Sequence, residues 1–279
     1  MIKLIYGGSM RDGMGAIKID ELISNGNITI LNADEDCTHY KIKYNNDIYY
    51  MKLITINEKV YNELIAEEIA HDFDIRCANT DLGIYKGNYY CLSKQIYNSN
   101  DKYIPMNNLM DEHDNNLTYI WNLLEDEYRD RKLISKLMDD LVNIFLFDVL
   151  IANYDRHVGN YGLIMSNNSV FVAPIFDNEN MLSVYSMIDG DFCIGMEDKD
   201  YYESDLFTKF LKLSSDIYLD KFESKLWIID QENVKKVIER VENKIGIQID
   251  LETRNRILLN FSDNLCSIRS IISNYRKVR

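Results

Sequence analysis

The feature that most constrains this chain is a set of three polar residues, Asp155, Asn160 and Asp177, in a stretch rich in apolar residues. Asn160 follows Asp155 by five positions, and Asp177 follows Asn160 by seventeen. Between them, the apolar runs 161–165 and 170–173 are separated by the sequence SNNS, a composition typical of a β-hairpin. Because a hairpin folds the chain back on itself, Asp177 is expected to lie beside Asn160.

This spacing is that of a phosphoryl-transfer site. In kinases a loop aspartate orients the attacking hydroxyl, an asparagine five residues later holds Mg²⁺, and a second aspartate bridges the metal to the phosphates. Mg²⁺ takes oxygen ligands, usually one or two from the protein and the rest from water and phosphate. From Leu133 the apolar residues recur at helical spacing, so a helix is expected to deliver the chain to Asn153, where the loop begins.

The segments ANYDRHVGNYGL and VAPIFDNENML resemble the catalytic and metal-binding segments of HipA-like serine/threonine kinases. The resemblance implies that Asp155 is the catalytic base, that Asn160 and Asp177 are the Mg²⁺ ligands, and that His157 braces the loop. Phosphoinositide kinases carry a similar D-R-H-x-x-N loop. The motif alone therefore leaves open whether the substrate is a protein or a lipid.

Composition narrows the class of protein and of partner. With 279 residues and 46% hydrophobic content, the chain can bury a sizeable core as one large domain or two lobes. A formal net charge of −14 argues against nucleic acid or an anionic membrane as the main partner, because both attract clustered cations. The five cysteines form no C-x-x-C pair, so neither a zinc site nor a disulfide framework is indicated. No apolar run approaches the ~18 residues of a membrane span, and the N-terminus lacks a signal peptide's apolar core, so a soluble, cytoplasmic protein is expected.

The N-terminal segment YGGSMRDGMG is a candidate nucleotide loop. Glycines let a backbone approach phosphate closely, and HipA-like kinases often carry a Gly-Gly segment that Gly7, Gly8 and Ser9 resemble. By the same resemblance, Ser9 is a candidate for self-phosphorylation. The alternative loop is 32–38 (NADEDCT), which lacks glycine and carries three acids that would repel a triphosphate. Gly7 to Ser9 is therefore favoured.

Residues 27–54 alternate in the manner of a β-meander, and the helical pattern of 60–73 follows. Lys52, in the last strand, resembles the kinase lysine that contacts the α and β phosphates. The resemblance implies that Glu63, on the helix, holds Lys52 by an ion pair. Glu67, one turn later, is the alternative, and each of these residues could instead be an ordinary solvated side chain.

Two further strands, 82–85 and 89–95, complete a small sheet. In a kinase the adenine slot follows such a strand, so Ser93 and Ile96 are expected to bound the hinge that binds the base. The polar stretch 97–101 is the expected boundary between the lobes.

The rest of the chain reads as helical apart from the hairpin, with helices at 117–128, 133–153, 204–213, 232–246 and 251–279. Asp148 lies in the apolar context FLFDVLI. Because a buried carboxylate needs hydrogen-bond partners, Asp148 is expected to contact the catalytic loop.

These patterns together predict an α+β, two-lobed, protein-kinase-like fold. A small β-rich N-lobe would span residues 1–97 and a larger helical C-lobe residues 98–279, with ATP and Mg²⁺ between them. The predicted activity is transfer of the γ-phosphoryl group to a serine or threonine of a protein substrate, and the chain itself is a candidate substrate. A lipid or small-molecule kinase and an ATP-binding pseudokinase are the alternatives.

Overall fold

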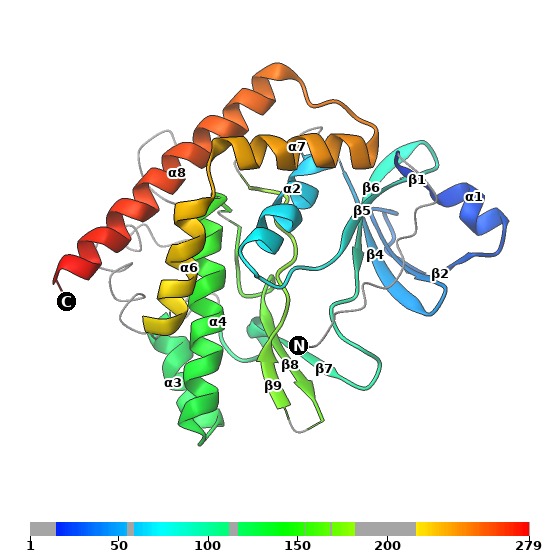
Figure 1. Cartoon of the computed structure of the whole chain (residues 1–279). Coiled ribbons are helices and arrows are strands. Elements are labelled where there is room, and N and C mark those ends of the chain that lie inside the picture. Colours follow the sequence, from blue (N-terminus) through cyan, green and yellow to red (C-terminus); the bar gives the residue numbers. More distant parts are fainter. Residues whose placement is uncertain are drawn as a thin grey trace.

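The computed structural model describes residues 15–54, 59–111, 117–153, 155–167, 169–181 and 216–278. Within them a β-rich N-terminal part is followed by a mostly helical part, so the expected α+β order of elements is present (Figure 1). The expected helix at 204–213 and the residues Gly7, Gly8 and Ser9 lie outside this part of the chain.

The N-terminal part is a six-stranded sheet in the order β1-β5-β6-β4-β3-β2. The expected meander and the expected later hairpin are confirmed, and the short strand β1 joins the sheet edge parallel to β5. One face of the sheet carries a hydrophobic cluster in which the Tyr40 ring packs edge-on against the rings of Tyr85 and Tyr90. The elements are β1 (Ile17–Lys18), α1 (Ile19–Ser24), β2 (Ile28–Ala33), β3 (His39–Tyr44), β4 (Asp47–Leu53), β5 (Thr80–Tyr85) and β6 (Asn88–Lys94).

Helix α2 (Lys59–Asp72) lies between this sheet and helix α7, and it packs into the larger hydrophobic core (Figure 1). Leu64, Ile65 and Ile69 of α2 are buried in the same cluster as the apolar side chains of the C-terminal helices. Ion pairs reinforce the contact, since Arg240 of α7 lies 3.0 Å from Glu68. Helix α2 is thus joined to the helical part of the molecule as well as to the sheet.

A second sheet contains β7 (Lys102–Pro105), β8 (Gly162–Ser166) and β9 (Ser169–Val172). The predicted hairpin is confirmed, because β8 and β9 pair antiparallel across the turn. Strand β7 was not expected, and it pairs antiparallel with β8. A Cβ at Gly162 would collide with the Ile104 carbonyl oxygen, so this close approach requires glycine. After β9 the chain runs on to Asp177.

Five α-helices, described in full or in part, form most of the C-terminal region. Asp130 caps α4 by accepting from the backbone N–H groups of Lys132 and Leu133, and Asp230 caps α7 in a reciprocal capping box with Asn233. The elements are the 3₁₀ turn η1 (Met106–Asn108), α3 (Leu117–Glu127), α4 (Arg131–Leu150), α6 (Asp216–Ile228), α7 (Gln231–Ile245) and α8 (Leu251–Val278).

Helix α6 was not predicted from the sequence. Leu219, Phe222 and Leu226 are buried at helical spacing, but Ile217 and Trp227 on other faces of the helix are 79% and 62% exposed. Because apolar residues surround the helix, its periodic signal is weak.

Among the described residues, no helix combines the length and the apolar character that crossing a membrane requires. The division into lobes at residue 97 stays a prediction.

Candidate active site

A cleft of about 710 Å³ lies between the N-terminal sheet and the segments around β7 and Asp177. Ligand pockets typically enclose roughly 300–1,000 Å³, so a nucleotide is of suitable size. Five of the predicted site residues line the cleft, namely Lys52, Glu63, Ser93, Ile96 and Asp177. Gly159 also lines it and brings the loop between α4 and β8 to the edge of the cavity.

The predicted catalytic loop is built around Arg156, a side chain with no solvent exposure. Its guanidinium forms a bidentate contact with the equally buried Asp148, at 3.0 and 2.9 Å. Burial lowers the pKa of Arg156, but Asp148 and the charges of Glu63 and Asp177 together raise it by more, so the guanidinium stays charged. Asn153 also donates to Asp148, at 3.1 Å. The expectation that Asp148 contacts the catalytic loop is therefore confirmed.

Arg156 also joins the two segments that carry the candidate metal ligands. Its Nη1 donates to the carbonyl oxygens of Asn160, at 3.0 Å, and Phe176, at 2.7 Å. The backbone at Asn160 is thereby placed next to the residue that precedes Asp177. The sequence analysis gave Arg156 no role, although a buried aspartate followed eight residues later by an arginine is a signal for such a pair.

Asp155 and its neighbours in the loop are held by short local contacts. The Asp155 carboxylate accepts from Asn180 Nδ2 at 2.7 Å, and its carbonyl accepts from Asn160 Nδ2 at 2.9 Å. His157 Nδ1 accepts from the Gly159 backbone N–H at 3.1 Å, and the His157 carbonyl accepts from the N–H of Asn160. These bonds close the loop into one turn.

Asn160 and Asp177 carry oxygen atoms of the kind that Mg²⁺ prefers. The Asn160 amide nitrogen donates to the Asp155 carbonyl, so the amide oxygen of Asn160 is the atom that would bind a cation. The Asp177 carboxylate already lies 3.0 Å from a cation, the Lys52 ammonium. The described residues contain no group of three or more His, Cys, Asp or Glu side chains placed to hold a metal.

Lys52 pairs with Asp177 and Glu179 and not, as expected, with Glu63. Lys52 lies 3.0 Å from Asp177 and 3.1 Å from Glu179. Burial lowers the pKa of Lys52, whereas the two carboxylates raise it by more, so that its pKa lies above its ordinary value. Glu63 instead accepts from the backbone N–H and the side-chain amide of Asn178. The alternative, Glu67, is also occupied elsewhere, because it accepts from Thr80.

Glu63 should make the stability of the protein depend on pH. Burial, and next the charge of Asp177, raise the pKa of Glu63 from its ordinary value of 4.5 to about 8. The folded state therefore binds the proton more tightly than the unfolded state, and the stability present below pH 4.5 is lost as the pH rises toward 8. Glu63→Gln should remove this loss, which we expect to be on the order of 1–3 kcal/mol. Urea unfolding at pH 5 and pH 8 measures it. The exposed Glu239→Gln serves as control, and equal pH slopes for Glu63→Gln and wild type would contradict the prediction.

The alternative nucleotide loop, residues 32–38, begins on the wall of the cleft. Asn32, Ala33 and Asp34, at the start of the alternative loop, line the cavity. The Asp34 carboxylate accepts from the backbone and hydroxyl of Thr38 at 2.7 and 2.6 Å, so its charge is turned into its own loop. These hydrogen bonds lower the pKa of Asp34, and the bond from the Thr38 hydroxyl has the largest effect. The alternative loop is thus adjacent to the cleft, while Gly7 to Ser9 stay a prediction.

Aromatic residues that the sequence analysis missed line the cleft near the expected hinge. Tyr97 stacks on Tyr103 with ring centroids 5.8 Å apart, and Tyr103 meets Phe176 edge-on at 6.3 Å. With Ile96, these rings offer an apolar wall of the kind that receives a planar base.

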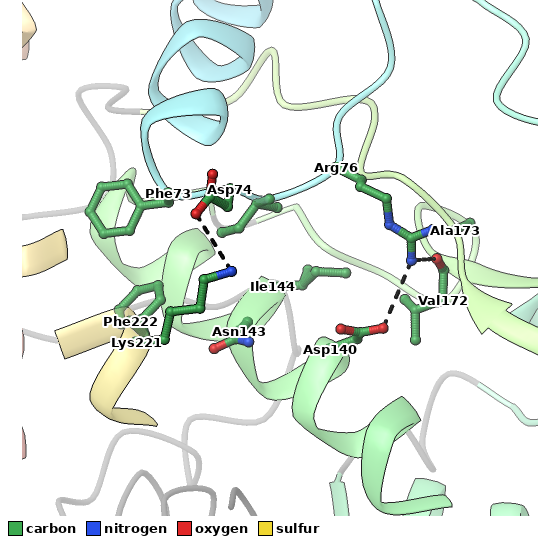
Figure 2. Close-up of a pocket in the computed structure, with 11 residues that line it drawn as sticks. Phe73, Asp74, Arg76, Asp140, Asn143, Ile144, Val172, Ala173, Lys221 and Phe222 are labelled. Atoms are coloured by element: carbon green, nitrogen blue, oxygen red, sulfur yellow. Dashed lines mark hydrogen bonds and ion pairs between the residues drawn. The ribbon is translucent and has the colours of Figure 1, made fainter. Parts of the chain in front are cut away.

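A smaller cavity of about 90 Å³ is lined by residues of α4 and α6 and by the segments 73–76 and 172–173 (Figure 2). Arg76 crosses it and donates to the Val172 carbonyl at 2.6 Å, with Asp140 at 3.8 Å. Lys221 lies 3.5 Å from Asp74. Because its charged groups are paired with one another, we assign this cavity to the scaffold of the protein.

Comparison with known proteins agrees with this geometry. No family model matches the chain. It is 26% identical to the serine/threonine-protein kinase CtkA of Helicobacter pylori over 154 residues, which make up 48% of this chain and 46% of that protein. The crystal structure of the Helicobacter pylori proinflammatory kinase CtkA superposes with a TM-score of 0.64, at 16% identity, over 94% of this chain and 99% of that one.

The HipA chain of the Shewanella oneidensis HipA, HipB and operator DNA complex gives a TM-score of 0.58 at 14% identity, over 98% of this chain and 76% of that one. The predicted resemblance to HipA-like kinases and the predicted protein-kinase-like fold are confirmed by these likenesses. The sequence match with CtkA spans less than half of either protein.

Proposed function

We propose that this CtkA-like chain, which shares the fold of HipA, is an ATP-dependent kinase that phosphorylates serine or threonine residues of proteins. The observation that carries the proposal is the 3.0 Å contact between Lys52 and Asp177 on the wall of the large cleft. It joins residues 125 positions apart in the sequence. A cation suited to phosphate and a carboxylate suited to Mg²⁺ thus lie side by side in a cavity of nucleotide size.

In this proposal, residues of the cleft bind ATP and Mg²⁺, and Arg156 holds their segments in place. Lys52 binds the phosphates, and the apolar wall of Ile96 and Phe176 receives the base. Mg²⁺ held by Asp177 and Asn160 would neutralise charge that develops on the phosphate oxygens. Arg156 keeps the catalytic loop and the Asp177 segment at a fixed separation, which phosphoryl transfer requires because it depends on positioning.

Asp155 is the proposed base. Asn180 donates to its Oδ2 at 2.7 Å, which fixes the orientation of the carboxylate. A substrate hydroxyl that donates its proton to Asp155 would be held in line with the γ-phosphoryl group. A protein substrate is supported by the similarity to CtkA, described as a serine/threonine-protein kinase. Ser9 is the proposed site of self-phosphorylation.

Asp155→Ala should reduce phosphoryl transfer by a factor of about 100 or more, because it removes the group that orients the hydroxyl. The measurement is incorporation of label from γ-labelled ATP and Mg²⁺, with the protein alone and with a generic basic protein. Asp126→Ala, which alters an exposed carboxylate of α3, is the matched control.

Two results would contradict the proposal. If no protein becomes labelled while ATP still raises the melting temperature, the chain is a nucleotide-binding pseudokinase. If label enters phosphoinositide vesicles or a small molecule and no protein, the acceptor is not a protein.

A further inference from the structure

The partner of Lys52 is a glutamate on the metal-binding segment. Glu179 lies 3.1 Å from the Lys52 ammonium, and its side chain is only 15% exposed. Lys59 of α2 holds the same carboxylate at 2.6 Å. Asn62 of α2 donates to the Glu179 carbonyl at 2.8 Å, so both the backbone and the side chain of Glu179 are fixed by α2. Glu179 also lines the cleft, as Lys52 does.

Glu63 has a different set of contacts. It is 3% exposed, and its two carboxylate oxygens accept from the backbone N–H and the side-chain amide of Asn178. The amide oxygen of Asn178 accepts in turn from Arg156 Nη2 at 2.5 Å. Since the amide of Asn178 is oriented at both ends, Glu63 and Arg156 together determine where the backbone at Asp177 lies.

Asp177 itself needs this support. Its φ of 58° lies in the left-handed region, which a residue other than glycine adopts only at a cost. The bonds to Asn178 keep the backbone in that conformation immediately after Asp177. The position of the Asp177 carboxylate in the cleft therefore depends on Glu63.

We propose that two glutamates have exchanged tasks relative to the arrangement expected from kinases: Glu179 positions Lys52, and Glu63 positions Asp177 through Asn178. This inference rests on the proposed function. Lys52 touches both Asp177 and Glu179. If Asp177 bound a metal ion, Glu179 would still hold Lys52 in its place on the wall of the cleft. Neither Glu179 nor Glu63 touches the substrate in this proposal, and both are positioning residues.

If Glu179 positions Lys52 and Glu63 positions Asp177, substituting the two glutamates should affect ATP binding in different ways. Glu179→Gln should weaken ATP binding about tenfold in the presence of EDTA, because Lys52 loses the carboxylate that orients it. Glu63→Gln should weaken this metal-free binding less than Glu179→Gln does, and it should reduce the gain in affinity on adding Mg²⁺ about tenfold or more, as changes behind a metal ligand do. Calorimetric titration of ATP with and without Mg²⁺ measures both effects. Glu68→Gln, an α2 residue paired with Arg240, is the control.

A double-mutant cycle makes the test specific. In a Lys52→Met background, Glu179→Gln should cause no further loss of metal-free ATP binding, whereas the effects of Lys52→Met and Glu63→Gln should be independent. The opposite result, coupling of Lys52 to Glu63 and none to Glu179, would overturn the inference. If Glu63→Gln does not fold, the double-mutant cycle between Lys52 and Glu179 alone tests the inference, and additive effects of these two substitutions would contradict it.

The readouts do not depend on phosphoryl transfer. A wild-type protein that binds ATP and transfers no phosphate would overturn the proposed function, and the titrations would still decide which glutamate serves Lys52.

Discussion

Asp177→Asn is expected to lower phosphoryl transfer by about three orders of magnitude, or roughly 4 kcal/mol of transition-state stabilisation. Asparagine removes the negative charge that holds Mg²⁺ but keeps an oxygen that can accept from Lys52. It also tolerates the left-handed backbone at this position, where φ is 58°, so the fold should survive. Transfer rates at saturating Mg²⁺, with melting curves to verify folding, measure the effect.

The exposed Asp263→Asn on α8 is the matched control and should behave as wild type. A further titration of Mg²⁺ separates binding from chemistry, since a variant that lacks a metal ligand should require far more Mg²⁺ for half-maximal rate. If Asp177→Asn keeps more than a tenth of the wild-type rate, Asp177 is not a metal ligand.

Arg156→Met should destabilise the protein by about 3–5 kcal/mol, because it leaves a buried carboxylate without its cation. Arg156 and Asp148 are both fully shielded from solvent, so water cannot replace the lost partner. Arg156 also donates to two backbone carbonyls and to Asn178, and these acceptors would lose a donor as well. The free energy of unfolding from chemical denaturation is the measurement.

Arg240→Met provides the contrast, because that side chain is 51% exposed in its pair with Glu68 and should cost less than about 1 kcal/mol. Pairing Arg156→Met with Asp148→Leu should recover part of the loss, since no buried charge then remains. A cost below 1 kcal/mol for Arg156→Met alone would mean that the buried pair does not hold the loop.

The parts of the fold that local patterns describe were predictable. The strands around Lys52, the hairpin that ends before Asp177, and the apolar helix that leads to Asn153 all depend on periodicity and turn composition over short windows. The spacing of Asp155, Asn160 and Asp177 predicts phosphoryl-transfer chemistry, and the hairpin between Asn160 and Asp177 is the part of that prediction that the structure confirms.

The partners of the glutamates were not predictable in this way. Glu63 and Asn178 are 115 positions apart, and no local pattern states that Asn178, rather than Lys52, will meet Glu63. The analogy with other kinases supplied the wrong partner, since Glu179, two residues beyond Asp177, takes that place. Helix α6 was missed for a different reason. Its exposed apolar residues Ile217 and Trp227 weaken the helical periodicity of its buried apolar residues.

The anchoring of α2 limits how this site could be switched off. Many kinases are controlled by the position of the corresponding helix. Here, swinging α2 outward would expose Leu64, Ile65 and Ile69, at roughly 1.5–3 kcal/mol for each side chain. It would also pull Glu63 from Asn178 and Lys59 from Glu179. Contacts with the sheet, with the C-terminal helices and with the segment after Asp177 therefore all oppose a displacement of α2.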